Sequence, residues 1–128
     1  ETTTVSEDGF ASTSQVGDFE LRIDATGEEG PDPNQTLVAT YAACYLPAFR
    51  VGADQRGHDD LGRVQIDADA GLDDDDDLTD VSFQIHVEAD LDDETAEEII
   101  ERADDICHVH TAVREGLQAD VTVAADAF

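Results

Sequence analysis

The sequence contains no lysine, and its only fixed cations are six arginines among 128 residues. Against them stand 33 Asp and Glu residues, which bring the net charge to −27. Because nucleic-acid phosphates are bound by basic side chains, this composition excludes nucleic acid as a partner. A folded acidic domain suits either a basic partner or molar salt, which screens charges beyond about 3 Å. The acids occupy nearly every segment instead of one patch, which favours a halophilic cell interior.

Long apolar runs are also missing. No stretch approaches the roughly 18 apolar residues of a membrane span, and the first residues lack the basic-then-apolar pattern of a secretory signal. We therefore expect no membrane association and a cytoplasmic location. Cysteine occurs only twice, and in a reducing cytoplasm paired thiols are more often catalytic or metal-binding than structural.

A clear apolar periodicity is present. Hydrophobic residues make up 40% of the chain, unlike the composition of a disordered acidic tail. The length predicts one domain spanning residues 1–128, with residues 1–8 polar and frayed. The longest apolar stretch, residues 33–51, predicts a helix. Six of its residues recur at helical spacing: Leu37, Tyr41, Cys44, Tyr45, Ala48 and Phe49. Pro33 suits the first turn of a helix, whereas Pro47 predicts a bend or an end just after Cys44.

The remaining segments alternate between strand and helix patterns. Residues 10–14 and 19–25 predict two strands around a turn, and Phe19, Leu21 and Ile23 form the face expected to be buried. Two further strands are expected at residues 62–70 and 80–89, the latter with Val81, Phe83, Ile85 and Val87 facing inward. A helix from Asp92 or Asp93 toward Val113, stopped at Gly116, precedes a last strand at 117–125. This β-β-α-β-β-α-β order predicts an α+β fold with two helices packed on an antiparallel sheet.

Three kinds of chemistry fit the remaining signals. Cys107, His108 and His110 with Cys44 suggest a zinc site, although a structural site needs four ligands and only the distant His58 and His86 remain. A cysteine hydrolase lacks its recognisable signatures. A two-thiol redox site needs only that Cys44 and Cys107 meet. The five aspartates at 73–77 read as a solvated loop tip, with a weak cation site as the alternative.

Two motifs point further. Pro33-Asn34-Gln35-Thr36-Leu37 with Tyr41-Ala42-Ala43-Cys44, and Cys107-His108-Val109-His110-Thr111-Ala112-Val113 near the end, resemble the OsmC/Ohr family of hydroperoxide reductases. The family motifs read approximately NPEQL…A-A-C and C-P-V-S. The resemblance implies an OsmC-like fold in an intertwined homodimer. It also implies that Cys44 attacks an organic hydroperoxide, that Cys107 resolves it as a disulfide, and that an external dithiol, such as a lipoylated protein, restores both. We expect no cofactor and no metal.

The chain departs from that family at two charged positions. Strong peroxidases of the family carry an arginine in a G-R-x-G pattern, where this chain has Ser6-Glu7-Asp8-Gly9, and a glutamate where it has Asn34. Without that cation, an apolar pocket is expected to raise the thiol pKa. Arg22, Arg50 or Arg114 remain candidates for its role. The second reading is therefore a catalytically weak relative that binds a small apolar or thiol-reactive ligand. His108 and His110 either assist Cys107 or lie at the surface, and we favour the surface.

Overall fold

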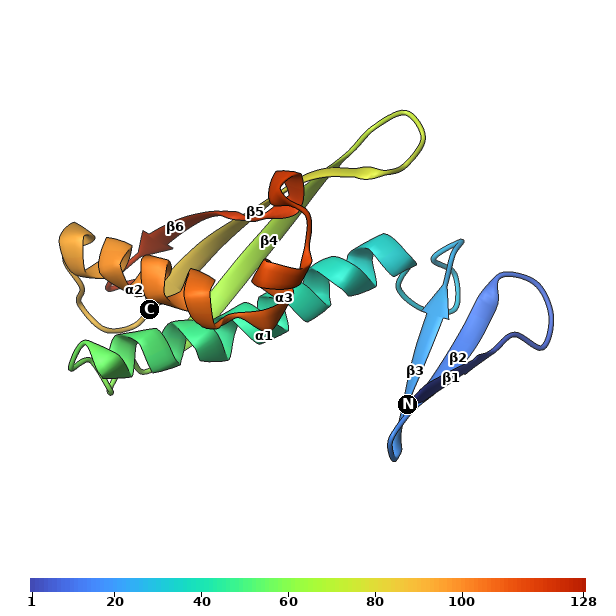
Figure 1. Ribbon diagram of the computed structural model, residues 1–128, viewed down its shortest axis with the longest axis horizontal. Helices are drawn as coiled ribbons and strands as arrows, with labels where there is room; N and C mark the ends of the chain where they lie inside the picture. Colours follow the sequence, from blue (N-terminus) through green and yellow to red (C-terminus); the bar gives the residue numbers. More distant parts are fainter. The chain divides into compact units, whose positions relative to one another are not determined.

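The computed structural model describes all 128 residues and forms two compact units, residues 1–37 and 38–128. In the first unit three strands make an antiparallel sheet in the order β1-β2-β3 (Figure 1). They are β1 Thr2–Val5, β2 Ala11–Val16 and β3 Phe19–Asp24. Gly17, at a φ of +59°, makes the tight turn between β2 and β3. The expectation that residues 1–8 are frayed is wrong, because Thr2–Val5 pairs along the edge of β2.

The alternation predicted for β3 does not bury its apolar face within one chain. Phe19 is 75% exposed and Leu21 is 47% exposed, whereas Ile23 is half-buried. Asp24, at the end of the strand, is the buried polar residue of this unit. Its carboxylate accepts hydrogen bonds from the backbone N–H groups of Thr26 at 2.8 Å and Glu29 at 3.0 Å. In the first unit the Asp24 carboxylate therefore stabilises the loop after β3, and the apolar face of β3 is exposed to solvent.

The second unit is a three-stranded sheet with helices. Helix α1 covers Pro33–Gln55, and the strands are β4 Val64–Leu72, β5 Leu78–Val87 and β6 Asp120–Ala124, in the order β4-β5-β6. Three helical segments connect β5 to β6: helix α2 Asp93–Ile106, the short helix α3 His108–Ala112 and a 3₁₀ turn Glu115–Leu117.

 Helix α3 consists of the five residues His108–Ala112. Figure 1 shows α1 and α2 running along this sheet.

The predicted α+β class is confirmed, but the sheet is not purely antiparallel. β4 and β5 pair antiparallel, whereas β5 and β6 pair parallel, with Phe83 opposite Val121. The reason is the connection: a parallel pair needs a long crossover, usually helical, and α2 and α3 supply it. Two predictions near the end of the chain are corrected. The last strand, expected at 117–125, is β6 and begins only at Asp120. Gly116, expected to stop a helix, lies within the 3₁₀ turn at residues 115–117.

The core lies between the helices and β5. The predicted inward residues of β5 are all buried, and Phe83 is held edge-on to Tyr41, with ring centroids 4.7 Å apart. The α1 residues buried in this core are Tyr41, Tyr45, Ala48, Phe49, Gly52 and Ala53. Gly52 allows close approach of α1 to α2, because a Cβ there would lie 3.2 Å from the Ile99 carbonyl oxygen. Leu37, expected on the same stripe, is 41% exposed.

Both helix predictions need a correction at their ends. Helix α1 continues through Pro47 to Gln55, so the proline does not end it, and the helix runs beyond the predicted residues 33–51. The second helix does not run on to Val113, because α2 stops at Ile106 and Cys107 adopts an extended conformation with φ −68° and ψ 113°. The chain thus turns a corner at the second cysteine.

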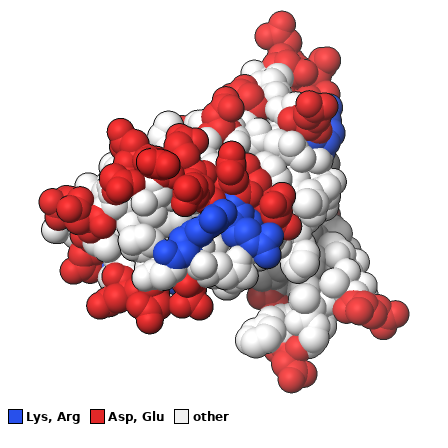
Figure 2. Space-filling model, turned by 60° about the vertical axis from the view of Figure 1, so that its left-hand side comes forward, with Lys and Arg blue, Asp and Glu red and all other residues white.

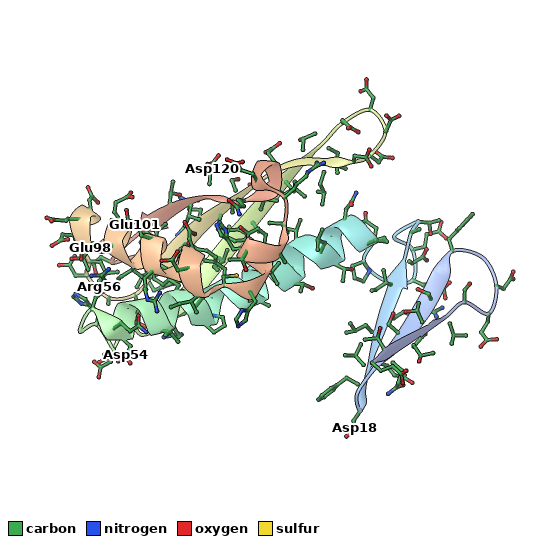
Figure 3. The ribbon with its side chains drawn as sticks, viewed as in Figure 1. Asp18, Asp54, Arg56, Glu98, Glu101 and Asp120 are labelled. Carbon is green, nitrogen blue, oxygen red and sulfur yellow. The ribbon has the colours of Figure 1, made fainter.

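The aspartate loop between β4 and β5 is exposed. One carboxylate oxygen of Asp73 accepts the backbone N–H groups of Asp75 at 2.8 Å and Asp77 at 3.0 Å. Acidic side chains are also scattered over the face seen in Figure 2, around a small group of arginines. Glu98, Glu101 and Asp54 are among the acidic residues at one end of the second unit (Figure 3). None of the helices has the length and hydropathy needed to cross a bilayer.

Candidate active site

The two thiols lie together in the second unit. Cys44, on α1, is half-buried, and Cys107, at the corner between α2 and α3, is 1% exposed. Both are free, and they lie close enough for each thiol to shift the pKa of the other. Helical spacing explains the position of Cys44, because the neighbouring Tyr41 and Tyr45 are buried in the core and carry it toward α3. The structure therefore brings together the two residues that the sequence singled out.

The Cys44 thiol is acidic for a thiol. Burial favours its neutral form, but hydrogen bonds from the backbone N–H of Val109, the Cys107 thiol and the backbone N–H of His108 outweigh burial. Together they hold the pKa of Cys44 below the ordinary value of 9.0. The expectation that a pocket without a cation raises this pKa is wrong, because hydrogen bonds to the thiolate stabilise it in place of a charge.

The Cys107 thiol has the opposite tendency. Burial raises its pKa above 9.0, the backbone N–H of His110 partly offsets this effect, and the neighbouring Cys44 raises the pKa further. The pair is therefore asymmetric, with the more exposed sulfur ionising first and the buried one keeping its proton. In a thiol pair this asymmetry separates the attacking sulfur from the sulfur that donates a hydrogen bond to it.

His110 lies under this pair, and not at the surface as we expected. It is 8% exposed, its backbone N–H donates to the Cys107 sulfur at 3.4 Å, and its Nδ1 lies 2.5 Å from the Tyr41 hydroxyl. The same hydroxyl accepts the backbone N–H of Ala119 at 2.9 Å. His108, by contrast, is exposed as expected. The missed signal was the Cys-x-x-His spacing, which places His110 at the third position of a helix capped by Cys107.

A second tyrosine extends the buried polar contacts. The Tyr45 hydroxyl donates to Asp104 at 2.8 Å and lies 3.4 Å from the Ile100 carbonyl oxygen. Burial and the Asp104 carboxylate both raise the pKa of Tyr45 far above its ordinary value, and burial also raises that of Tyr41. Asp104 lies 3.9 Å from Nε2 of His110. Both tyrosines thus stay protonated and act as hydrogen-bond donors.

The candidate arginines have other partners. Arg22 pairs with Glu29 at 3.2 Å, while Arg50 and Arg114 donate to the carbonyl oxygens of Gly62 at 2.8 Å and Leu78 at 2.5 Å. No arginine is among the groups that shift the pKa of Cys44. Asn34, which replaces the family glutamate, lies in the first turn of α1.

The zinc hypothesis is not supported by the positions of the ligands. Asp73, Asp75 and Asp77 form the one group of three His, Cys, Asp or Glu side chains whose ligand atoms all lie within 4.8 Å of one another. These three are exposed and hold the turn. His86 instead lies 3.0 Å from Asp67 on the neighbouring strand. The two cysteines and His110 therefore act as a hydrogen-bonded group.

Comparison with known proteins identifies the family to which this fold belongs. The family model for the OsmC-like protein matches residues 25–122. An uncharacterized protein of Haloferax volcanii is 68% identical over 128 residues, covering 100% of this chain and 97% of that protein. The chain belongs to the OsmC-like family.

Solved structures share the fold at low sequence identity. An OsmC-like protein from Mycoplasma pneumoniae is 18% identical, with a TM-score of 0.79 over 98% of this chain and 94% of that one. The organic hydroperoxide resistance protein OhrB of Bacillus subtilis is 23% identical, with a TM-score of 0.71 over 97% and 96% of the two chains. The predicted family and fold are thereby confirmed.

Proposed function

We propose that this protein is a thiol-dependent peroxidase that reduces organic hydroperoxides with Cys44 and Cys107. The observation that carries the proposal is the proximity of two free thiols, each of which shifts the pKa of the other, with the pKa of Cys44 lowered. A peroxide needs a thiolate as its nucleophile, and a resolving thiol must lie close enough to form a disulfide afterwards. Family membership and the likeness to a hydroperoxide resistance protein support the same chemistry.

The cycle balances with an external dithiol. The Cys44 thiolate attacks one peroxide oxygen, the O–O bond breaks, and the departing alkoxide takes a proton from solvent to become an alcohol. Cys44 is then a sulfenic acid. The Cys107 sulfur attacks the Cys44 sulfur, the S–S bond forms, and the S–O bond breaks, so that hydroxide leaves with the Cys107 proton as water. A dithiol of the lipoyl type then reduces the disulfide and is itself oxidised to a disulfide.

The chain uses amide hydrogen bonds where strong peroxidases of the family use an arginine. The backbone N–H groups of Val109 and His108 lower the pKa of Cys44, and because the fold fixes these groups they stabilise negative charge on the sulfur without rearrangement. Arg50 and Arg114 are engaged elsewhere, which favours the second candidate, a protein that binds a small apolar or thiol-reactive ligand and reacts slowly with peroxides. The two candidates differ in whether peroxide yields a disulfide.

Assembly and location complete the proposal. Phe19 and Leu21 leave an apolar strand face open, which supports a homodimer, since exposed apolar surface of this kind is typical of interfaces. The family match at residues 25–122 extends over parts of both units and supports one OsmC-like domain over residues 1–128. A dithiol reductant is available in a reducing cytoplasm. The acidic composition and the Haloferax relative support a cytoplasm that is rich in salt.

Intact mass measured after a peroxide pulse tests this function. Reduced protein in molar KCl receives one equivalent of cumene hydroperoxide, and the Cys44→Ser and Cys107→Ser variants serve as matched controls. We expect the wild type to lose two hydrogen atoms as an internal disulfide and the Cys44→Ser variant to keep its mass. An unchanged wild-type mass over many minutes would reject the peroxidase and favour the ligand-binding candidate.

A further inference from the structure

One hydrogen bond joins the helix of the first cysteine to the segment of the second. Tyr41 lies three residues before Cys44 on α1, and its hydroxyl meets Nδ1 of His110 on α3 at 2.5 Å. Both residues are buried, at 2% and 8% exposure. Since the Tyr41 pKa is raised by burial, its hydroxyl keeps a proton that it can donate to Nδ1 of His110, while the backbone N–H of Ala119 donates to the same oxygen. The contact is therefore fully satisfied.

The two sulfurs receive the amide groups at the start of α3. The backbone N–H of His110 donates to the Cys107 sulfur at 3.4 Å, and the backbone N–H groups of Val109 and His108 lie close enough to the Cys44 thiol to lower its pKa. The first N–H groups of a helix have no partner within the helix, so the sulfurs take the place of an ordinary cap. Any movement of α3 away from α1 would withdraw the two amides that hold Cys44.

The geometry points to His110 as a positioning residue, locked by Tyr41, that holds the α3 amides against the Cys44 thiolate. The role deepens the proposed function, on which it rests, because it concerns the same thiol pair. The imidazole touches neither peroxide nor sulfur in this role. It acts through the Tyr41 hydrogen bond and through its own backbone N–H.

The residues around the thiols allow the effect of the Tyr41–His110 hydrogen bond to be measured apart from that of the Tyr45–Asp104 hydrogen bond. The titratable groups around the thiols are Tyr41 and Tyr45 on α1, Asp104 on α2 and His110 on α3. Tyr45 ties α1 to α2 through Asp104 and does not touch α3 by hydrogen bonding. Tyr41 is thus the tyrosine whose loss should act on the α3 amides.

The test measures the ionisation of Cys44 and needs no peroxide. The pH dependence of Cys44 alkylation by iodoacetamide is followed by peptide mass in molar KCl. It is recorded for the wild type and for Tyr41→Phe, His110→Leu and His110→Asn. Asparagine offers an acceptor near the position of Nδ1, so it should restore the bond that leucine removes. Ile99→Val, a change in the buried core, serves as a control for loss of stability alone.

We expect Tyr41→Phe and His110→Leu to raise the Cys44 pKa and to slow alkylation at pH 7 by about threefold or more, since one pKa unit corresponds to a tenfold change in thiolate. His110→Asn should recover most of the rate, and Ile99→Val should keep it. Equal rates in Tyr41→Phe and the wild type, or an equal slowing in Ile99→Val, would overturn the positioning role. If His110→Leu does not fold, Tyr41→Phe and His110→Asn decide. A raised pKa in a protein that peroxide does not oxidise would keep this role and reject the peroxidase.

Discussion

Cys44 shows how a thiol becomes acidic without a neighbouring cation. Two backbone amides and one thiol donate to it, and their combined effect exceeds that of burial. Backbone amides are fixed by the fold, so they do not have to move or lose water when the charge forms. The asymmetry between Cys44 and Cys107 follows from this geometry, because only Cys44 receives a proton donor from the other thiol.

This asymmetry makes a prediction for stability against pH. Cys44 has a folded pKa below its unfolded value, so its contribution is present above the unfolded pKa and is lost as the pH falls through the folded pKa. Between these two pKa values, stability of the wild type relative to Cys44→Ser should rise with pH. Melting temperatures of the two proteins, reduced and in molar KCl, measure the difference. A constant difference from pH 6 to pH 9 (about the ordinary thiol range) would contradict the lowered pKa.

The sequence predicted the thiol pair but not its surroundings. Cys44 and Cys107 were selected because they are the two cysteines, lie in helical patterns and match family motifs. His110 was expected at the surface. It is buried because the chain breaks between α2 and α3, and the sequence pattern did not predict this break. Local periodicity cannot reveal that break, since the cap at Cys107 depends on a hydrogen bond that its sulfur accepts from the backbone N–H of His110.

At the scale of elements, strand patterns were more reliable than helix ends. The alternation at 80–89 predicted β5 and its buried face, because side chains of a strand alternate strictly. The strand β1 was missed because Thr2–Val5 is mostly polar and lies exposed along its whole length, so only its pairing with β2 reveals it. The parallel placement of β6 was missed because a crossover is a property of the whole connection.

Helix α1 passes through Pro47, which makes a prediction. A proline inside a helix removes one backbone hydrogen bond and costs roughly 3 kcal/mol of stability. Replacing it also raises the conformational entropy of the unfolded chain, which lowers stability by about 0.4–1 kcal/mol. Because Pro47 is exposed, Pro47→Ala loses no core packing and should stabilise the protein by about 2 kcal/mol. Denaturant unfolding in molar salt measures it. Thr40→Ala, another exposed change on α1, controls for propensity, and a destabilised Pro47→Ala would show that the proline fits a bend that the core requires.

At the scale of the molecule, charge dominates. A net charge of −27 on 128 residues is repulsive, and the acidic side chains visible in Figure 2 are spread over the face shown. Salt shortens the range of this repulsion from about 10 Å at 0.1 M to about 3 Å at 1 M. The composition revealed this property directly, whereas a dimer would need surface contacts that sequence patterns do not specify.

The protein should therefore depend on salt. Dialysis from molar KCl into dilute buffer should lower the melting temperature sharply or dissociate the proposed homodimer, because the acids are no longer screened. Calorimetry and light scattering across a KCl series follow the two effects. A sucrose series separates screening from the stabilisation that excluded solutes provide. A sharp unfolding transition at an unchanged temperature in dilute buffer would count against a halophilic protein.

The central claim is that Cys44 is the sulfur that peroxide oxidises and that Cys107 resolves it. The most direct measurement is peptide mass spectrometry of the Cys107→Ser variant after cumene hydroperoxide and a sulfenic-acid trap such as dimedone. The proposal predicts the trapped adduct on Cys44 and none in Cys44→Ser. An adduct on Cys107 in Cys44→Ser, with none on Cys44 in Cys107→Ser, would contradict it.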